Sequence, residues 1–179
     1  MLTTDNSVLV VVDVQGRLAQ LMYDKENLFA NIGRMIKGAQ LLGVPILWTE
    51  QYPEGLGATI PELAQLMAES QPLVKDTFSC CGDNKFADAL KSTGRRQVLL
   101  TGIETHVCVY QTARDLLADG FGVELIADAV SSRTAANKEL GIARMKDLGA
   151  GVMSTEMALF ELLQVAKGDK FKEVLRIVK

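Results

Sequence analysis

Three side chains with complementary chemistry stand just after short apolar runs of this sequence. Asp13 directly follows the apolar run 8–12, Lys75 follows a shorter run, and Cys108 stands a few residues after a third. A carboxylate, an ammonium group and a thiol can together supply a base, an electrostatic support and a nucleophile. If the apolar runs are parallel strands of one sheet, their ends bring these three groups to one edge.

Each group has a predicted part in such chemistry. Cys108 lies at the start of a helix predicted over residues 107–117, where the helix dipole and a nearby ammonium group favour the thiolate. Asp13 is predicted to accept the thiol proton and return it to a leaving group, which is typically worth about 10²- to 10⁴-fold in rate. Lys75 is predicted to hold Asp13 and Cys108 in position electrostatically. Backbone N–H groups within 101–108 are candidates to stabilise an oxyanion.

The sequence predicts a sheet that can position these groups. Apolar, β-branched runs predict buried strands at 7–12, 44–48, 97–100, 123–126 and 151–153, with a weaker strand at 73–74. Helical patterns lie between them at 27–42, 60–69, 84–91, 107–117 and 135–148, and the C-terminal stretch 154–179 is predicted to be helical in two pieces broken near Gly168. This alternation predicts a three-layer α/β/α sandwich with a mostly parallel, Rossmann-like sheet. Ligands of such sheets bind outside the carboxyl ends of the strands.

Length and charge narrow the classes of partner. A chain of 179 residues predicts a single domain over residues 1–179. A net charge of −3 argues against a nucleic-acid or anionic-membrane binder, which would show a basic face. The run 8–12 is too short to cross a bilayer and no secretory signal precedes it. We therefore expect a soluble, cytoplasmic protein that acts on a small molecule.

Cysteine and histidine usage argues against disulfides and metals. The three cysteines, Cys80, Cys81 and Cys108, are an odd number with two adjacent, which is a poor disulfide framework. His106 is the single histidine, so a zinc site of the usual multi-ligand kind is difficult to assemble. We expect no metal and no cofactor, with Cys80 and Cys81 as packing or pocket-wall residues and His106 in a loop or capping role.

Three motifs, in order, resemble the isochorismatase-like cysteine hydrolases. They are Val-Val-Asp-Val-Gln at 11–15, Val-Lys-Asp-Thr-Phe-Ser at 74–79 and Gly-Ile-Glu-Thr-His-Val-Cys-Val at 102–109, and the last is followed by Thr-Ala at 112–113. The resemblance spans nearly the whole chain. It implies a triad of Asp13, Lys75 and Cys108, a cis peptide bond between Ile103 and Glu104, and an oxyanion hole formed by the amides of Glu104 and Cys108. It also implies a homo-oligomer.

The sequence departs from two branches of this family. Nicotinamidase-like members carry Asp-x-His and a further histidine that bind a metal, whereas the corresponding stretch here, 49–55, has no histidine. Isochorismatases proper lack a cysteine at the nucleophile position, so Cys108 argues against that reaction. The chain looks more like an isochorismatase-domain subgroup related to nicotinamidase and N-carbamoylsarcosine amidase.

Two functions therefore compete at the level of sequence. The first is a metal-independent cysteine hydrolase that cleaves the C–N bond of a small amide through a thioester on Cys108. The second is a catalytically idle member of the same fold that acts as a binding or scaffold protein. For the first, the residues just beyond the predicted strand ends are candidates to line the substrate pocket: Gln15, Leu18, Gln51, Tyr52 and Phe78. Glycine-rich phosphate loops and Cys-x-x-Cys are absent, which argues against nucleotide binding and thiol–disulfide exchange.

Overall fold

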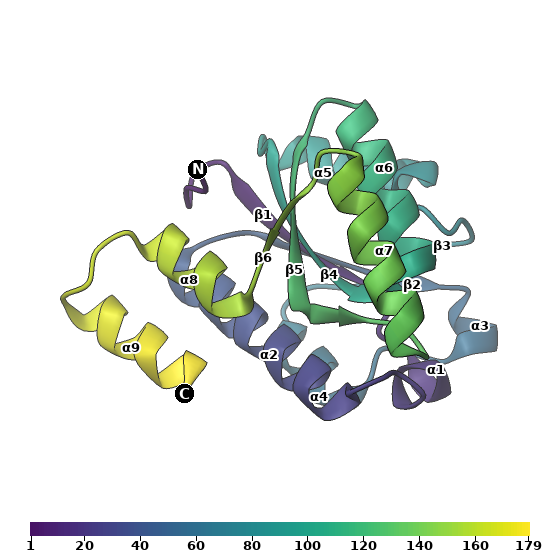
Figure 1. Cartoon of the computed structure of the whole chain (residues 1–179), viewed down its shortest axis with the longest axis horizontal. Helices are drawn as coiled ribbons and strands as arrows, with labels where there is room; N and C mark the ends of the chain where they lie inside the picture. The colour runs from purple at the N-terminus through teal and green to yellow at the C-terminus, as the bar shows by residue number, and fades with distance from the viewer.

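A computed structural model describes all residues, 1–179, and its centre is one six-stranded parallel sheet (Figure 1). The strands are β1 (Ser7–Val12), β2 (Ile46–Gln51), β3 (Leu73–Lys75), β4 (Gln97–Ile103), β5 (Gly122–Ser131) and β6 (Gly151–Met153). Their order across the sheet is β3-β2-β1-β4-β5-β6, and every neighbouring pair is parallel. The chain therefore builds outward from β1 in one direction and from β4 in the other. The predicted three-layer α/β/α class is confirmed, with a sheet that is parallel throughout.

Helices cover both faces of this sheet (Figure 1). The longer helices are α2 (Lys25–Leu42), α5 (Asn84–Ser92), α6 (Tyr110–Ala118), α7 (Ala135–Asp147), α8 (Thr155–Leu163) and α9 (Asp169–Val178). Three short helices, α1 (Gly16–Gln20), α3 (Pro53–Leu56) and α4 (Pro61–Ala64), lie in the loops after β1 and β2. No helix in the chain combines the length and the apolar character that crossing a bilayer requires.

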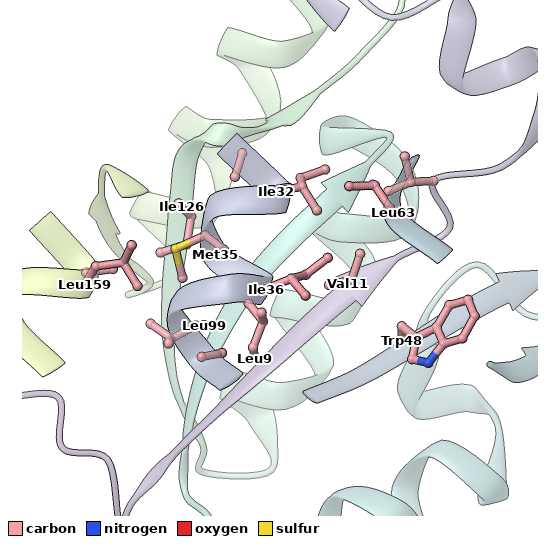
Figure 2. Packing of buried hydrophobic residues seen from close by; sticks show 14 of the residues in the cluster. Leu9, Val11, Ile32, Met35, Ile36, Trp48, Leu63, Leu99, Ile126 and Leu159 are labelled. Atoms are coloured by element: carbon pink, nitrogen blue, oxygen red, sulfur yellow. The ribbon is translucent and has the colours of Figure 1, made fainter. Parts of the chain in front are cut away.

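Successive side chains of β1 point to opposite faces of the sheet and so belong to two separate core layers. Leu9 and Val11 belong to the cluster that contains α2, α8 and α9 side chains, whereas Val8, Val10 and Val12 belong to the cluster of α5, α6 and α7. Figure 2 shows the first layer, in which Ile32, Met35 and Ile36 of α2 face Leu9, Val11 and Leu99 of the sheet. Both faces of β1 are buried, which explains why its sequence is a continuous apolar run and does not alternate.

Several element boundaries differ from the predicted ones for identifiable reasons. The strand predicted at 44–48 is β2 at Ile46–Gln51, because the Val44 amide bonds to Ala39 at the end of α2 and the strand continues through polar residues. The helix predicted at 60–69 is α4 followed by a 3₁₀ turn at Gln65–Met67, and it starts at Pro61 because a residue preceding proline, here Ile60, disfavours helical geometry. The helix predicted at 107–117 begins at Tyr110, after a π-helical turn over Thr105–Val109.

Gly102 is required where β4 pairs with Val12 of β1. Its φ is +112°, and a Cβ at this position would lie 2.2 Å from the carbonyl oxygen of Val12. We expect Gly102→Ala to lower the free energy of unfolding by at least about 3 kcal/mol, since strained backbone and overpacking add. Gly94→Ala is the matched control, because Gly94 also has a positive φ of +68° but no neighbour within 4 Å, and should cost about 1 kcal/mol. Urea unfolding of both variants measures the difference, and equal losses would contradict the role assigned to the Val12 contact.

Candidate active site

The carboxyl ends of β1, β3 and β4 bring the three predicted reactive groups into one site. Asp13 follows β1, Lys75 is the last residue of β3, and Cys108 lies in the π-helical turn after β4. The sheet order reverses direction between β1 and β4, and this is the position at which open parallel sheets bind their ligands. A cavity of about 200 Å³ opens there, and Asp13 and Cys108 both line it.

Lys75 and Asp13 form a buried ion pair. Lys75 Nζ lies 2.6 Å from Asp13 Oδ2, and the two side chains are only 1% and 5% exposed. Lys75 Nζ also donates to the carbonyl oxygens of Thr77 at 2.9 Å and Phe78 at 3.2 Å. Because a buried charge is stable only when paired and hydrogen-bonded, these contacts hold Lys75 in place and leave its ammonium group directed at protein atoms.

The second oxygen of the Asp13 carboxylate is held by a residue that sequence reasoning missed. Thr49 Oγ1 donates to Asp13 Oδ1 at 2.7 Å and is buried at the end of β2, beside Cys80 Sγ at 3.7 Å. The Asp13 backbone has a φ of +51°, a left-handed conformation that is uncommon for a residue with a side chain. The signal available in the sequence was a hydroxyl residue directly after the apolar residues Leu47 and Trp48.

Gln51 lies between the ammonium group and the thiol. Its Oε1 accepts from Lys75 Nζ at 3.4 Å and from Cys108 Sγ at 3.4 Å. Its backbone is fixed by Gln15, whose side chain accepts from the Gln51 amide at 2.7 Å and donates to the Gln51 carbonyl at 3.0 Å. Gln15 also donates to the carbonyl of Gly57 at 2.7 Å, so it ties the end of β2 to the loop after α3.

Of the five residues predicted to line the pocket, the structure places three in the cavity lining and two outside it. Leu18, Gln51 and Phe78 line the cavity. Gln15 and Tyr52 do not line it: Gln15 is fully buried and hydrogen-bonded to backbone groups, and Tyr52 lies exposed at the surface. The remaining lining residues, beside Asp13 and Cys108, were not predicted as pocket walls: Leu56, Ile103, Glu104 and Val107.

The segment after β4 has the backbone geometry that the resemblance implied. The peptide bond between Ile103 and Glu104 is cis. The Glu104 carbonyl accepts from the amides of Val107 at 3.0 Å and Val109 at 3.2 Å, which closes the π-helical turn. The Glu104 carboxylate is buried and accepts from the backbone amide of Arg133 at 3.0 Å and from its Nε at 3.1 Å. A second ion pair therefore borders the cavity.

The expectation of a stabilised thiolate is wrong for the resting site. Burial raises the pKa of the Cys108 thiol, and the Asp13 carboxylate raises it further, while Lys75 lowers it by less. The Lys75 charge is already paired with Asp13, so its effect on the thiol is offset. Cys108 is therefore a neutral thiol at pH 7, next to a carboxylate that can take its proton.

This protonation state has a measurable consequence. Because the pKa of Cys108 lies above its usual value, we expect alkylation of Cys108 by iodoacetamide to rise by about tenfold per pH unit from pH 6 to pH 9. Intact-mass measurement follows the reaction, with Cys108→Ala reporting the background from Cys80 and Cys81. A rate that reaches its plateau below pH 7 would contradict this assignment.

The residues around the cavity do not fit a metal. No group of three or more histidine, cysteine, aspartate or glutamate side chains is arranged to hold an ion. The single histidine, His106, does not line the cavity, and its Nδ1 is 3.0 Å from Ser132 Oγ. Cys80 and Cys81 are free thiols outside the cavity lining, and burial raises the pKa of Cys80 to about 11.

Comparison with known proteins identifies the class to which this fold and site belong. The isochorismatase domain matches residues 7–157, so the chain belongs to the isochorismatase family and has the fold of its hydrolases. Isochorismatase domain-containing protein 2 of Danio rerio is 37% identical over 179 residues, which cover 99% of this chain and 89% of that protein. The structure of MAR1 ribonuclease from Caenorhabditis elegans superposes with a TM-score of 0.92 at 36% identity, covering 99% of this chain and 91% of that one. The YcaC gene product of Escherichia coli, described as an octameric hydrolase of unknown specificity, has a TM-score of 0.89 at 23% identity and shows the same fold over 98% and 89% of the two chains.

Proposed function

We propose that this chain is a metal-independent cysteine hydrolase that cleaves the C–N bond of a small amide. The observation that carries the proposal is that Cys108 and Asp13 line one cavity, while Lys75 Nζ lies 2.6 Å from the Asp13 carboxylate. A neutral thiol beside a fixed base is the pairing that nucleophilic catalysis requires. An idle scaffold has no need of a buried, paired carboxylate next to a thiol at the bottom of a cavity.

The first half of the reaction forms a thioester. Cys108 Sγ attacks the amide carbonyl carbon as its proton moves to Asp13, and the carbonyl oxygen becomes an oxyanion. We assign the stabilisation of this oxyanion to the backbone amides of Glu104 and Cys108, in a type of contact worth about 10²- to 10³-fold in rate. The C–N bond then breaks, and Asp13 returns the proton to the departing nitrogen. Lys75 holds Asp13 in position throughout through the ion pair.

The second half consumes water. A water molecule attacks the thioester carbonyl carbon as Asp13 takes one of its protons. The C–S bond breaks, the acid leaves, and the proton on Asp13 returns to Cys108 Sγ. Gln51, which contacts both Lys75 and Cys108, is a positioning residue in this scheme because it fixes the distance between the ammonium group and the thiol.

A panel of small amides tests the proposal directly. The protein is incubated with each amide, released ammonia or amine is measured, and the mass of the protein is recorded during turnover. We expect at least one amide to be hydrolysed and to leave an acyl group on the protein that maps to Cys108. If no amide is hydrolysed and none acylates Cys108, the proposed activity is wrong.

The ribonuclease activity in the name of the Caenorhabditis elegans neighbour is not what this site supports. RNA is a polyanion and its binding depends on lysine and arginine contacts to phosphates. Here the cavity lining contains no lysine or arginine, and the net charge of the chain is −3. A small substrate fits the cavity of about 200 Å³ better than a phosphodiester chain does.

We also propose that copies of the chain assemble. The support is the description of the Escherichia coli YcaC product, which has this fold, as an octamer. Light scattering on the purified protein measures the mass in solution. A mass equal to the 19.5 kDa of one chain at micromolar concentration would contradict assembly.

A further inference from the structure

The charged residues that line the cavity are all acidic. The lining consists of two acidic residues, Asp13 and Glu104, the neutral residue Gln51 and six hydrophobic residues, and the Glu104 carboxylate bonds to Arg133 outside the lining. No lysine, arginine or histidine belongs to it. A ligand that enters this cavity therefore meets mostly apolar walls and no free cation.

The two cations that pair with these acidic residues are held by protein groups. Lys75 is 2% exposed and directs its ammonium group at Asp13, at the Gln51 side chain and at two backbone carbonyls. Arg133 is paired with Glu104 through Nε at 3.1 Å, and its side chain is 57% exposed outside the cavity lining. Neither cation is directed into the space where a substrate carboxylate would lie.

These contacts make an anionic substrate unfavourable. A carboxylate that leaves water for this cavity loses its hydration without gaining a cationic partner, because no lysine or arginine lines the cavity. An ammonium group gains little, because both carboxylates already have cationic partners. A neutral amide with an apolar acyl chain loses the least hydration free energy on entering, since Leu18, Leu56 and Phe78 provide apolar walls.

From this we infer that the cavity selects neutral amides with a short apolar acyl group and excludes amides that carry a carboxylate. The selection of amides as substrates rests on the proposed function, but the charge selectivity of the cavity can be measured without turnover. It deepens the proposed function because amide hydrolysis by itself does not specify the charge of the acyl group.

Two alkylating reagents that differ in charge test the inference. Iodoacetamide is neutral and iodoacetate is anionic, and both form an S–C bond at the thiol while iodide leaves and the thiol proton passes to solvent. The ratio of their rates at Cys108, from intact mass at pH 8, is compared with the ratio at the thiol of N-acetylcysteine amide. We expect the preference for iodoacetamide at Cys108 to exceed that of the free thiol by at least about tenfold. An equal or smaller preference would overturn the inference.

Phe78 offers a matched pair of variants, because it lines the cavity yet is 53% exposed, so its replacement leaves the core intact. Phe78→Lys introduces a cation at the cavity wall and is expected to reduce the preference for iodoacetamide by about tenfold. Phe78→Met changes the shape without the charge and is expected to keep the preference. If both variants behave alike, charge in the lining is not what selects the reagent.

A pair of amides then connects the cavity to hydrolysis. 4-Methylpentanamide and succinamate have the same shape, with an isopropyl group in one where the other has a carboxylate. We expect kcat/KM for 4-methylpentanamide to be at least about a hundredfold higher. Hydrolysis of both at similar rates would overturn the charge selection and leave the proposed hydrolase intact. Charge-selective alkylation together with failure of every amide to react would overturn the hydrolase and leave the cavity's preference for neutral ligands standing.

Discussion

Cys108→Ala is expected to abolish amide hydrolysis, with kcat/KM falling by roughly 10⁴-fold or more. The reason is that the thioester cannot form without the sulfur, so the remaining site can only bind the substrate and polarise its carbonyl. The change removes one atom from a residue that is 8% exposed, so the free energy of unfolding should fall by no more than about 1 kcal/mol. Ammonia release and urea unfolding measure the two quantities.

Cys81→Ala is the matched control for this variant. Cys81 is also a free cysteine, and it lies outside the lining of the active-site cavity. We expect it to retain wild-type turnover and to show the same acyl adduct. Undiminished hydrolysis by the Cys108→Ala variant would contradict the thioester mechanism. If the chain acts instead as a scaffold, the partner binding and cellular effect of Cys108→Ala would equal those of the wild-type protein.

Asp13→Asn is expected to have the next largest effect on turnover, a loss of about 10²- to 10⁴-fold in kcat. Asparagine cannot accept the thiol proton or deliver it to the leaving nitrogen. It also leaves the buried ammonium group of Lys75 without its carboxylate, so we expect a loss of about 3 to 5 kcal/mol in the free energy of unfolding. Steady-state kinetics and urea unfolding measure both losses.

A second measurement separates the catalytic effect of Asp13→Asn from its structural one. The Asp13 carboxylate raises the pKa of Cys108, so its removal lowers that pKa and increases the thiolate fraction at pH 8. Alkylation of Cys108 by iodoacetamide should therefore become faster while hydrolysis becomes slower. Parallel losses in both reactions would indicate a distorted site and would contradict the assignment of Asp13 as the base.

Thr49→Val provides the matched control at the same carboxylate. It removes the hydrogen bond to Asp13 Oδ1 but keeps the charge and the ion pair with Lys75. We expect a loss of about 1 to 2 kcal/mol in stability, and a reduction in kcat of only about tenfold because the base remains in place. A loss as large as that of Asp13→Asn would mean that orientation, and not proton transfer, limits the reaction.

The sequence alone determined the sheet and the edge at which the chemistry lies. The run Ser7–Val12 is apolar because both faces of β1 are covered, so composition and order were sufficient to predict it. Asp13, Lys75 and Cys108 were predicted to meet because parallel strands end at a common edge, and the structure brings Asp13 and Cys108 to one cavity with Lys75 bonded to Asp13. These features depend on the local pattern of apolar residues and on the direction of the strands, and both can be predicted from the amino-acid sequence.

The tertiary structure decided the contacts that no local pattern contains. The sequence predicted both Gln15 and Gln51 as pocket residues. In the structure Gln15 is fully buried against backbone groups, whereas Gln51 lines the cavity and contacts Lys75 and Cys108. The protonation of Cys108 was predicted incorrectly, because the balance between burial, Asp13 and Lys75 depends on distances between segments far apart in the chain. Side-chain direction and desolvation are set only when the strands and loops pack together, and those two quantities decide which reactive residues face the cavity and in which charge state.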